Sequence, residues 1–322
     1  MLGRHTGIVL LIIILNIDCL GQGADPGPGY QMLMTSNPAL SGSEGNGVLR
    51  LSYLNYYPGN NYNLHSVYVS YDSYFSDLHG GAGIYVSDDY LGGIVNDLKV
   101  GFSYAYFLQA GKDFFINAGL SASIYHRGYN FDNAVLPDQI DPLVGVTGPS
   151  SEVLTGKGQN IFDLGVGFLL ISGKFFGGFS ISHLTEPDLS GTGLPDERLK
   201  RKLLLHLTGD FDIFKKNSLK VRPVTFLALQ NGFLSAGAGA VLESNYLSVN
   251  AIMLGDSGGN MNIQTGFSIN TGKLNIFYNY RFNIGSENKL MPFSLLHQTG
   301  LAFSLNSVDK KYIIKAIKFP KL

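Results

Sequence analysis

The sequence predicts an all-β protein, a transmembrane antiparallel β-barrel of roughly 14 strands. Three observations lead to this fold class. The composition, with 41 Gly, 18 Tyr and 21 Phe among 322 residues, suits tight turns, strands and interfacial aromatic side chains better than long helices. Beyond the amino-terminal segment, no apolar run is long enough for a membrane helix. From about Leu49 onward, the chain falls into segments that alternate between apolar and polar residues.

The amino terminus has the features of a secretion signal. Arg4 precedes an apolar run from Ile8 to Leu15, and a small-x-small cleavage site follows at residues 19–21. We expect cleavage to leave Gln22 as the new start. A membrane-anchoring helix is the less favoured alternative, because the run falls short of the about 20 residues that span a bilayer. Cys19 is the single cysteine, so the mature chain should lack disulfides and cysteine-based sites.

Two segments show the alternation most clearly, with apolar residues on one face and polar residues on the other. Around Leu203, the apolar face carries Leu203, Leu205, Leu207, Phe211 and Ile213, and the polar face carries His206, Thr208, Asp210 and Asp212. Around Leu274, the apolar face carries Leu274, Ile276, Tyr278, Tyr280, Phe282 and Ile284, and the polar face carries Asn275, Asn279, Arg281 and Asn283. A soluble sandwich also alternates, but its strands usually end after about five or six residues.

Counting the segments gives roughly fourteen strands, and an even number suits closure of an antiparallel barrel. The predicted strands are 48–57, 63–75, 80–88, 97–109, 113–126, 160–172, 174–184, 201–214, 218–230, 232–243, 245–255, 260–271, 272–285 and 294–306. We therefore expect a signal peptide at 1–21, a periplasmic entry segment at 22–47, the barrel at 48–306 and a basic tail at 307–322. The tail is equally compatible with a periplasmic docking segment and with a frayed end.

Loop lengths support this count, since such barrels have short periplasmic turns and long outer loops. The connections after even-numbered strands are short, as at Lys215 to Asn217, whereas Arg127 to Gln159 and Leu184 to Lys200 both follow odd-numbered strands. Asn231-Gly232 is the exception, because it should be an outer loop yet has the sequence of a tight hairpin. The sequence therefore leaves the strand register near residues 230–260 open.

The two longest loops are the predicted recognition surface, because structureless connections of that length usually carry function. Their acidic residues are candidate partner contacts: Asp132, Asp138, Asp141, Glu186 and Asp188. A calcium site is less favoured than a solvated acidic loop, since the carboxylates lack the spacing of a calcium-binding loop.

Inward-facing polar residues are candidates to line a path through the barrel: Gln264, Asn275, Asn279, Arg281 and Asn283. They would suit a porin or small-molecule transporter, and they would equally suit the ordinary polar filling of a barrel. The formal net charge of -1 argues against nucleic acid as a partner. An enzyme is not expected, because Ser182 and His183 are neighbours on a strand and should point to opposite faces. No cofactor or metal ion is expected.

A resemblance to a known family enters at the residues before the first strand. The segment from Tyr30 to Gly42 resembles the entry motif of PorP/SprF proteins through a set of shared residue types: Tyr30, Met34, Asn37, Pro38, Ala39 and Gly42. Similar pieces follow in the family's order at 81–106, 118–142 and 163–187. The chain departs from the family in having no Trp after the first strand and in its basic tail.

The resemblance implies a non-enzymatic barrel of the type IX secretion system in the outer membrane of a Bacteroidota-type bacterium. Related proteins assist the secretion or surface attachment of large adhesins, and the family includes gliding-motility proteins. The implied partners are outer-membrane lipid, type IX components on the periplasmic side, and a secreted cargo or adhesin at the cell surface.

Overall fold

The computed structural model describes residues 31–60, 63–131, 135, 137–141, 143–146, 148, 150, 158–189, 198–214, 219–286 and 292–305. The predicted signal peptide, the basic tail and the turn at Lys215 to Asn217 lie outside the described residues. Among the described residues, no helix has the length and apolar character needed to cross a membrane.

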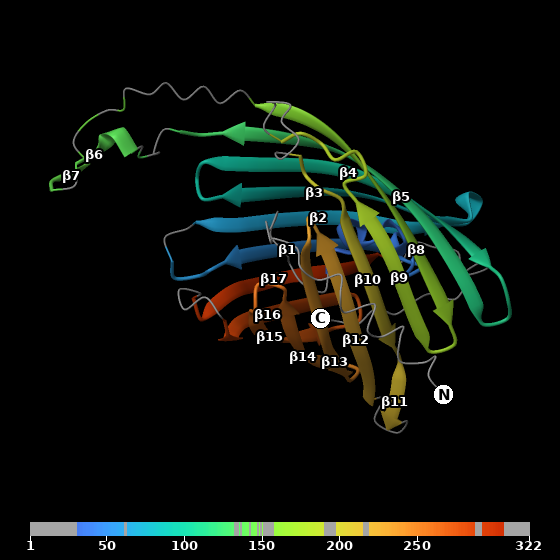
Figure 1. Cartoon of the computed structure of the whole chain (residues 1–322). Coiled ribbons are helices and arrows are strands. Elements are labelled where there is room, and N and C mark those ends of the chain that lie inside the picture. Colours follow the sequence, from blue (N-terminus) through green and yellow to red (C-terminus); the bar gives the residue numbers. More distant parts are fainter. Residues whose placement is uncertain are drawn as a thin grey trace, which may run out of the picture.

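One antiparallel sheet curls round and closes into a barrel (Figure 1). Its strands are β1 Gly47–Tyr56, β2 Leu64–Phe75, β3 Gly80–Leu91, β4 Val95–Gln109, β5 Phe114–Tyr129, β8 Gln159–Ser172, β9 Phe175–Ser182, β10 Lys202–Gly209, β11 Phe211–Phe214, β12 Leu219–Gln230, β13 Phe233–Glu243, β14 Leu247–Asp256, β15 Met261–Asn270, β16 Leu274–Gly285 and β17 Ser294–Leu305. Sequential strands pair with each other, and the β1–β17 pairing joins the first strand to the last.

The predicted fold class is confirmed: the barrel has 14 strands when β10 and β11, which pair with the same neighbour β12, are counted as one. The predicted strand 201–214 is divided into β10 and β11 at Asp210, and both pieces pair with β12. At the connection of β12 to β13, Gln230 pairs with Phe233, and both Asn231 and Gly232 have positive φ angles. The tight hairpin expected there is therefore present, because Asn-Gly tolerates the left-handed backbone that a two-residue turn needs.

The two ends of the barrel differ in the length of their connections. At the short-turn end lie the connections β2–β3, β4–β5, β8–β9, β13–β14 and β15–β16, together with the start of β1. At the long-loop end, residues 130–158 join β5 to β8 and carry a small hairpin of β6 Ile140–Asp141 and β7 Gly145–Val146, which extends away from the barrel (Figure 1).

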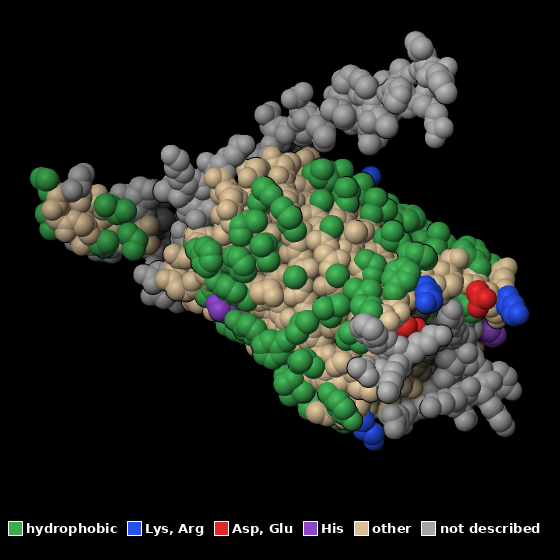
Figure 2. Space-filling view, turned by 90° about the horizontal axis from the view of Figure 1, so that it is seen from below, with side chains coloured by type: hydrophobic (Ala, Val, Ile, Leu, Met, Phe, Trp, Pro, Cys, Tyr) green, Lys and Arg blue, Asp and Glu red, His purple; other side chains and the backbone are tan. Residues whose placement is uncertain are grey.

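Because residues along each strand point alternately outward and inward, the barrel has an apolar outer surface. Leu203, Leu205 and Leu207 of β10 are 42%, 53% and 51% exposed, while His206 and Thr208, on the opposite face, are buried. Hydrophobic side chains cover much of the face seen in Figure 2, as expected for a surface in contact with lipid.

Part of the lumen is occupied by the chain segment that precedes β1, residues 31–46, which we call the plug. It contains the short helix α2 Leu33–Ser36 and the 3-10 helix η1 Pro38–Leu40. Leu33, Met34 and Leu40 are at most 2% exposed. The sequence predicted a periplasmic position for 22–47, but the described part of that segment lies inside the barrel. The lumen wall buries these apolar side chains.

Apolar wall residues meet the plug near the short-turn end. Leu33, Ala39 and Leu40 belong to one buried cluster with side chains from six strands: Phe115, Leu169, Ile171, Phe176, Val224, Phe226, Val241, Ile252 and Leu254. Burial of this apolar area favours the docked position of the plug.

Candidate functional site: the plug and the outer cavity

Glycines of the neighbouring strands β5 and β8 form a seat for the plug. A Cβ atom at Gly167 of β8 would lie 2.0 Å from Asn37 Oδ1, and one at Gly119 of β5 would lie 2.2 Å from the backbone nitrogen of Ala39. Real Cβ atoms do not approach other atoms so closely, so the plug backbone reaches the wall only because side chains are missing there.

Asn37 fixes the plug on this seat. It is fully buried, and its Nδ2 donates hydrogen bonds to the carbonyl oxygens of Phe168 and Phe179, at 3.2 and 3.4 Å. The same atom lies 3.1 Å from Nε2 of His206 on β10. Its Oδ1 accepts a 2.9 Å hydrogen bond from the N–H of Ala39 and thereby caps η1. One side chain thus joins β8, β9 and β10 to the plug.

Charged residues hold the other end of the plug. The N–H of Gly42 donates to Oδ2 of Asp72 on β2, at 2.7 Å. Arg50 of β1 forms ion pairs with both Asp72 and Glu44. Gly42 has a φ of +67° and lies against Gly81, where a side chain would not fit. A buried cation between two carboxylates therefore ties the plug to β1 and β2.

The residues of the predicted entry motif therefore gather in the plug. Met34 packs on Tyr68 and Tyr85, and Pro38 and Ala39 form η1 beside the Asn37 cap. Tyr30 lies outside the described residues. The sequence indicated the motif but not its position in the lumen.

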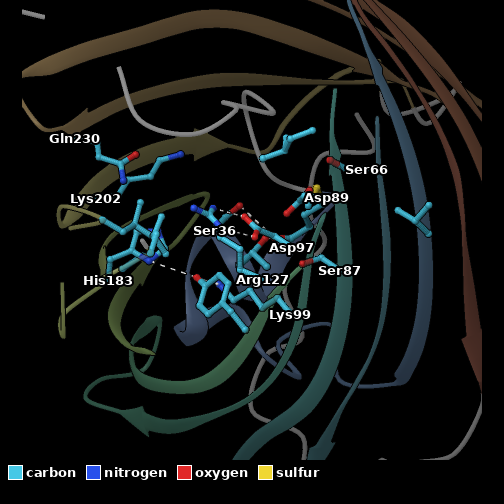
Figure 3. Close-up of a pocket in the computed structure, with 18 of the residues that line it drawn as sticks. Ser36, Ser66, Ser87, Asp89, Asp97, Lys99, Arg127, His183, Lys202 and Gln230 are labelled. Atoms are coloured by element: carbon cyan, nitrogen blue, oxygen red, sulfur yellow. Dashed lines mark hydrogen bonds and ion pairs between the residues drawn. The ribbon is translucent and has the colours of Figure 1, made fainter. Parts of the chain in front are cut away.

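On the long-loop side of the plug lies a cavity of about 420 Å³, which we call the outer cavity (Figure 3). Met32, Thr35 and Ser36 of the plug form part of its lining. Its remaining walls combine polar with apolar side chains, among them Ser87, Asp89, Asp97, Lys99, Tyr125, Arg127, His183, Leu199, Lys202 and Leu204.

Two groups of interacting polar side chains lie at the wall of the outer cavity. The first joins Lys99 and His183 through Tyr125 and Asp163. Lys99 Nζ donates to the Tyr125 hydroxyl at 2.6 Å and lies 4.4 Å from the centre of the same ring. His183 Nδ1 lies 2.8 Å from Oδ2 of Asp163. In the second grouping, Arg127 donates two hydrogen bonds to Asp97, at 2.7 and 2.5 Å. Such pairing offsets part of the cost of placing charges in the lumen wall.

The position of His183 corrects the expectation that it and Ser182 point to opposite faces. Strand β9 ends at Ser182, and His183 takes a left-handed backbone with a φ of +59°. Both residues consequently line the outer cavity. Strand alternation applies only within the strand, and sequence alone did not locate its end.

Three of the residues predicted to face the lumen are buried and form hydrogen bonds with neighbours in the wall. Gln264 and Asn279 are 1% exposed and Arg281 is 9% exposed. Arg281 donates to Oε1 of Gln264 from Nε and Nη2, at 3.3 and 2.9 Å. Asn279 accepts from Asn250 and donates to Gln298. Hydrogen bonds of this kind are typical of the ordinary polar filling of a barrel.

The two remaining residues of that set lie nearer the ends of the same strand. Asn275 and Asn283 occupy the inward-facing register of β16 and are partly buried. Asn283 Nδ2 donates to Oδ1 of Asn262 at 2.9 Å. Neither residue lies among those that line the outer cavity.

Within the described residues, the acidic loop residues make contacts inside the chain. Asp138 accepts from the Ser150 hydroxyl at 2.8 Å, and Asp141 accepts from the N–H groups of Leu143 and Val144 in the β6–β7 turn. Asp132 lies outside the described residues.

The second long loop follows the same pattern. Glu186 lies 3.5 Å from Arg201 and 3.9 Å from Lys200, and Asp188 forms an isolated backbone bridge with Arg198. In the part of the chain that the structure describes, no group of three or more His, Cys, Asp or Glu residues could hold a metal ion.

Structure comparison finds outer-membrane barrels that resemble the chain at low sequence identity. The TodX deltaS2S3 mutant, a monoaromatic hydrocarbon channel, is 14% identical with a TM-score of 0.53, and the match covers 92% of this chain and 98% of that chain. The Pseudomonas putida toluene transporter TodX is 13% identical with a TM-score of 0.49, covering 84% and 93%. The Acinetobacter baumannii outer membrane protein Omp33 is 10% identical with a TM-score of 0.47, covering 82% and 100%. The similarity to the TodX deltaS2S3 mutant is a similarity of fold alone.

Family comparison gives the more specific result. No curated protein matches the chain. The sequence pattern of the family described as type IX secretion system membrane protein PorP/SprF matches residues 30–297, which include the plug and nearly all of the barrel. The chain therefore belongs to the PorP/SprF family of type IX secretion system membrane proteins and is an integral protein of the outer membrane.

Proposed function

We propose that this protein is a non-enzymatic component of the type IX secretion system that assists the secretion or surface anchoring of cargo proteins such as adhesins. The observation that carries the proposal is the plug. A barrel whose lumen holds a buried segment of its own chain, with Asn37 and Arg50 tying that segment to five strands, is suited to be a fixed platform. An open pore would need a continuous polar path instead.

The outer loops are the proposed contact surface for cargo. Residues 127–159 form the longest connection, and the hairpin that it carries presents Leu143 and Val144, which are 96% and 77% exposed. The acidic residues Asp138 and Asp141 support the shape of this hairpin. Type IX components on the periplasmic side are the proposed partners of the short-turn end, and outer-membrane lipid surrounds the apolar face.

Deletion in the native host tests the proposal. Cells without the protein should still synthesise the cognate cargo but lose it from the cell surface, and the protein should co-purify with type IX components. A variant that joins residue 130 to residue 158 through a short Gly-Ser linker should keep the folded barrel and lose cargo display, because loops contribute little to the packing of the barrel. A full-length protein carrying Leu143→Ser and Val144→Ser tests the hairpin tip separately.

The rival function is a porin or small-molecule transporter, and the outer cavity is the observation that favours it. The two proposals predict opposite results in one pair of assays. Normal cargo display together with the loss of uptake of a solute, or steady conductance of the purified barrel in planar bilayers, would refute the secretion role and support transport.

A further inference from the structure

Two opposite charges in the wall of the outer cavity lack a charged partner. Asp89 of β3 and Lys99 of β4 both line the cavity. Among the described residues neither of them forms an ion pair, whereas the neighbouring Asp97 is paired with Arg127. Figure 3 shows these four side chains on the same side of the cavity. Because charges that are withdrawn from bulk water are normally paired, Asp89 and Lys99 are available to a charged ligand.

The surroundings of Lys99 favour an anionic oxygen as its partner. Its Nζ donates a 2.6 Å hydrogen bond to the Tyr125 hydroxyl, and this hydroxyl donates in turn to Oδ2 of Asp163 at 3.3 Å. An ammonium group has three N–H donors, so two remain after the bond to Tyr125. Within the part of the chain that the structure describes, Lys99 makes no other hydrogen bond. Tyr125 therefore positions a cation whose remaining donors can bind a carboxylate.

The spacing of Asp89 and Lys99 suits a single small molecule. In the β3–β4 register Ser87 is opposite Lys99 and Asp89 is opposite Asp97, so Asp89 and Lys99 are diagonal neighbours on adjacent strands. Diagonal neighbours of an antiparallel pair lie about 7–8 Å apart. That separation allows one small molecule to place an ammonium group on Asp89 and a carboxylate on Lys99.

The rest of the lining offers room for an apolar side chain. Met32 of the plug, Leu199 before β10 and Leu204 on β10 all line the cavity. The cavity volume of about 420 Å³ lies in the range that is typical of sites for small molecules. Contact with these three side chains would remove an apolar group of the ligand from water.

We propose that the outer cavity binds a small zwitterion with an apolar side chain, either a free amino acid or a short peptide. Asp89 accepts hydrogen bonds from the ammonium group of the ligand, and Lys99 donates to its carboxylate. The apolar side chain packs against Met32, Leu199 and Leu204. This inference is independent of the cargo role, and it concerns binding rather than passage through the barrel.

Equilibrium dialysis of the folded full-length barrel in detergent tests the proposal with two radiolabelled probes, L-leucine and L-leucyl-L-leucine. Saturable binding of at least one probe is expected, and the probe that binds more tightly distinguishes a free amino acid from a peptide. The amidated form of that probe lacks the carboxylate, and the N-acetylated form lacks the ammonium group. Each should compete about 10- to 100-fold less well than the probe itself. Absence of saturable binding, or competition by both analogues as strong as that of the probe, would overturn the proposal.

Two substitutions assign the contacts. Lys99→Met should weaken binding of the zwitterion about 10- to 100-fold and leave the amidated analogue unaffected, while Asp89→Asn should spare only the N-acetylated analogue. Lys273→Met, in the exposed β15–β16 turn, is the control and should bind as the wild type does. Unchanged affinity for the zwitterion in both variants, or equal weakening of all ligands, would refute the assignment of the site to Asp89 and Lys99. The analogue series on wild-type protein decides the proposal even if a variant fails to fold.

Discussion

Replacement of Asn37 by alanine should release the plug without unfolding the barrel. The substitution removes the acceptor of the Ala39 N–H and the partner amide of His206, both of which are buried. Loss of a partner costs a buried polar group about 1–3 kcal/mol, and with the lower part of that range, about 1–2 kcal/mol, for each of the two groups we expect about 2–4 kcal/mol less free energy of docking. Because each 1.4 kcal/mol changes an equilibrium tenfold, the fraction of barrels with an undocked plug should rise roughly 30- to 700-fold.

Single-channel recording in planar bilayers measures this effect. Wild-type protein should be closed, and Asn37→Ala should show frequent openings. The variant should keep the heat-modifiable electrophoretic mobility of a folded barrel. Asn245→Ala, in the exposed β13–β14 turn, changes the same residue type away from the lumen and should stay closed. If Asn37→Ala conducts no more often than Asn245→Ala, the hydrogen bonds of Asn37 do not hold the plug and this account of the seat is wrong.

Three further predictions concern the lipid face, the buried ion pair and the orientation. Leu205→Arg should lower the free energy of unfolding by about 2–4 kcal/mol if the residue lies near the bilayer midplane. Urea unfolding in detergent measures this loss, with Leu205→Ala as the control. Normal assembly with arginine would mean that the outer face is misassigned. Arg50→Met should lower the free energy of unfolding by about 3–5 kcal/mol, because it leaves Asp72 charged, buried and without this partner. The double variant Arg50→Met with Asp72→Asn should recover part of the loss. The absence of any recovery would argue against the pairing. Trypsin added to intact cells should cleave within 127–159 and spare Lys273 in the β15–β16 turn, whereas the opposite pattern would invert the orientation.

The barrel wall was predictable because its physical requirements repeat along the chain. Every strand must present apolar side chains to lipid at every second position, and each must end in a turn, so Leu203, Leu205 and Leu207 carry the same information as Ile276 and Tyr278. The number of strands followed from counting these repeats. The interruption at Asp210 did not, because Gly209 and Asp210 alone do not distinguish a break within a strand from its continuation.

The lumen was less predictable because its contacts are specific to single residues far apart in sequence. Nothing in the local pattern around Asn37 distinguishes a buried cap from an exposed turn. Gly119 and Gly167 read as ordinary strand glycines, although a plug backbone lies against both. The wall of the outer cavity was missed for a similar reason, since Lys99, Tyr125 and Asp163 belong to three strands that alternation alone does not align.

The span of chain between Asn37 and its partners constrains the order in which the molecule can assemble. Phe168, Phe179 and His206 follow Asn37 by 131, 142 and 169 residues. Contacts of such separation require large loops to close before they contribute any stability, so they form slowly. The amino-terminal segment must then wait beside a growing, open sheet until β8, β9 and β10 exist, and it must enter before β17 pairs with β1 and closes the barrel. We expect this step to limit the rate at which the folded protein appears in the membrane.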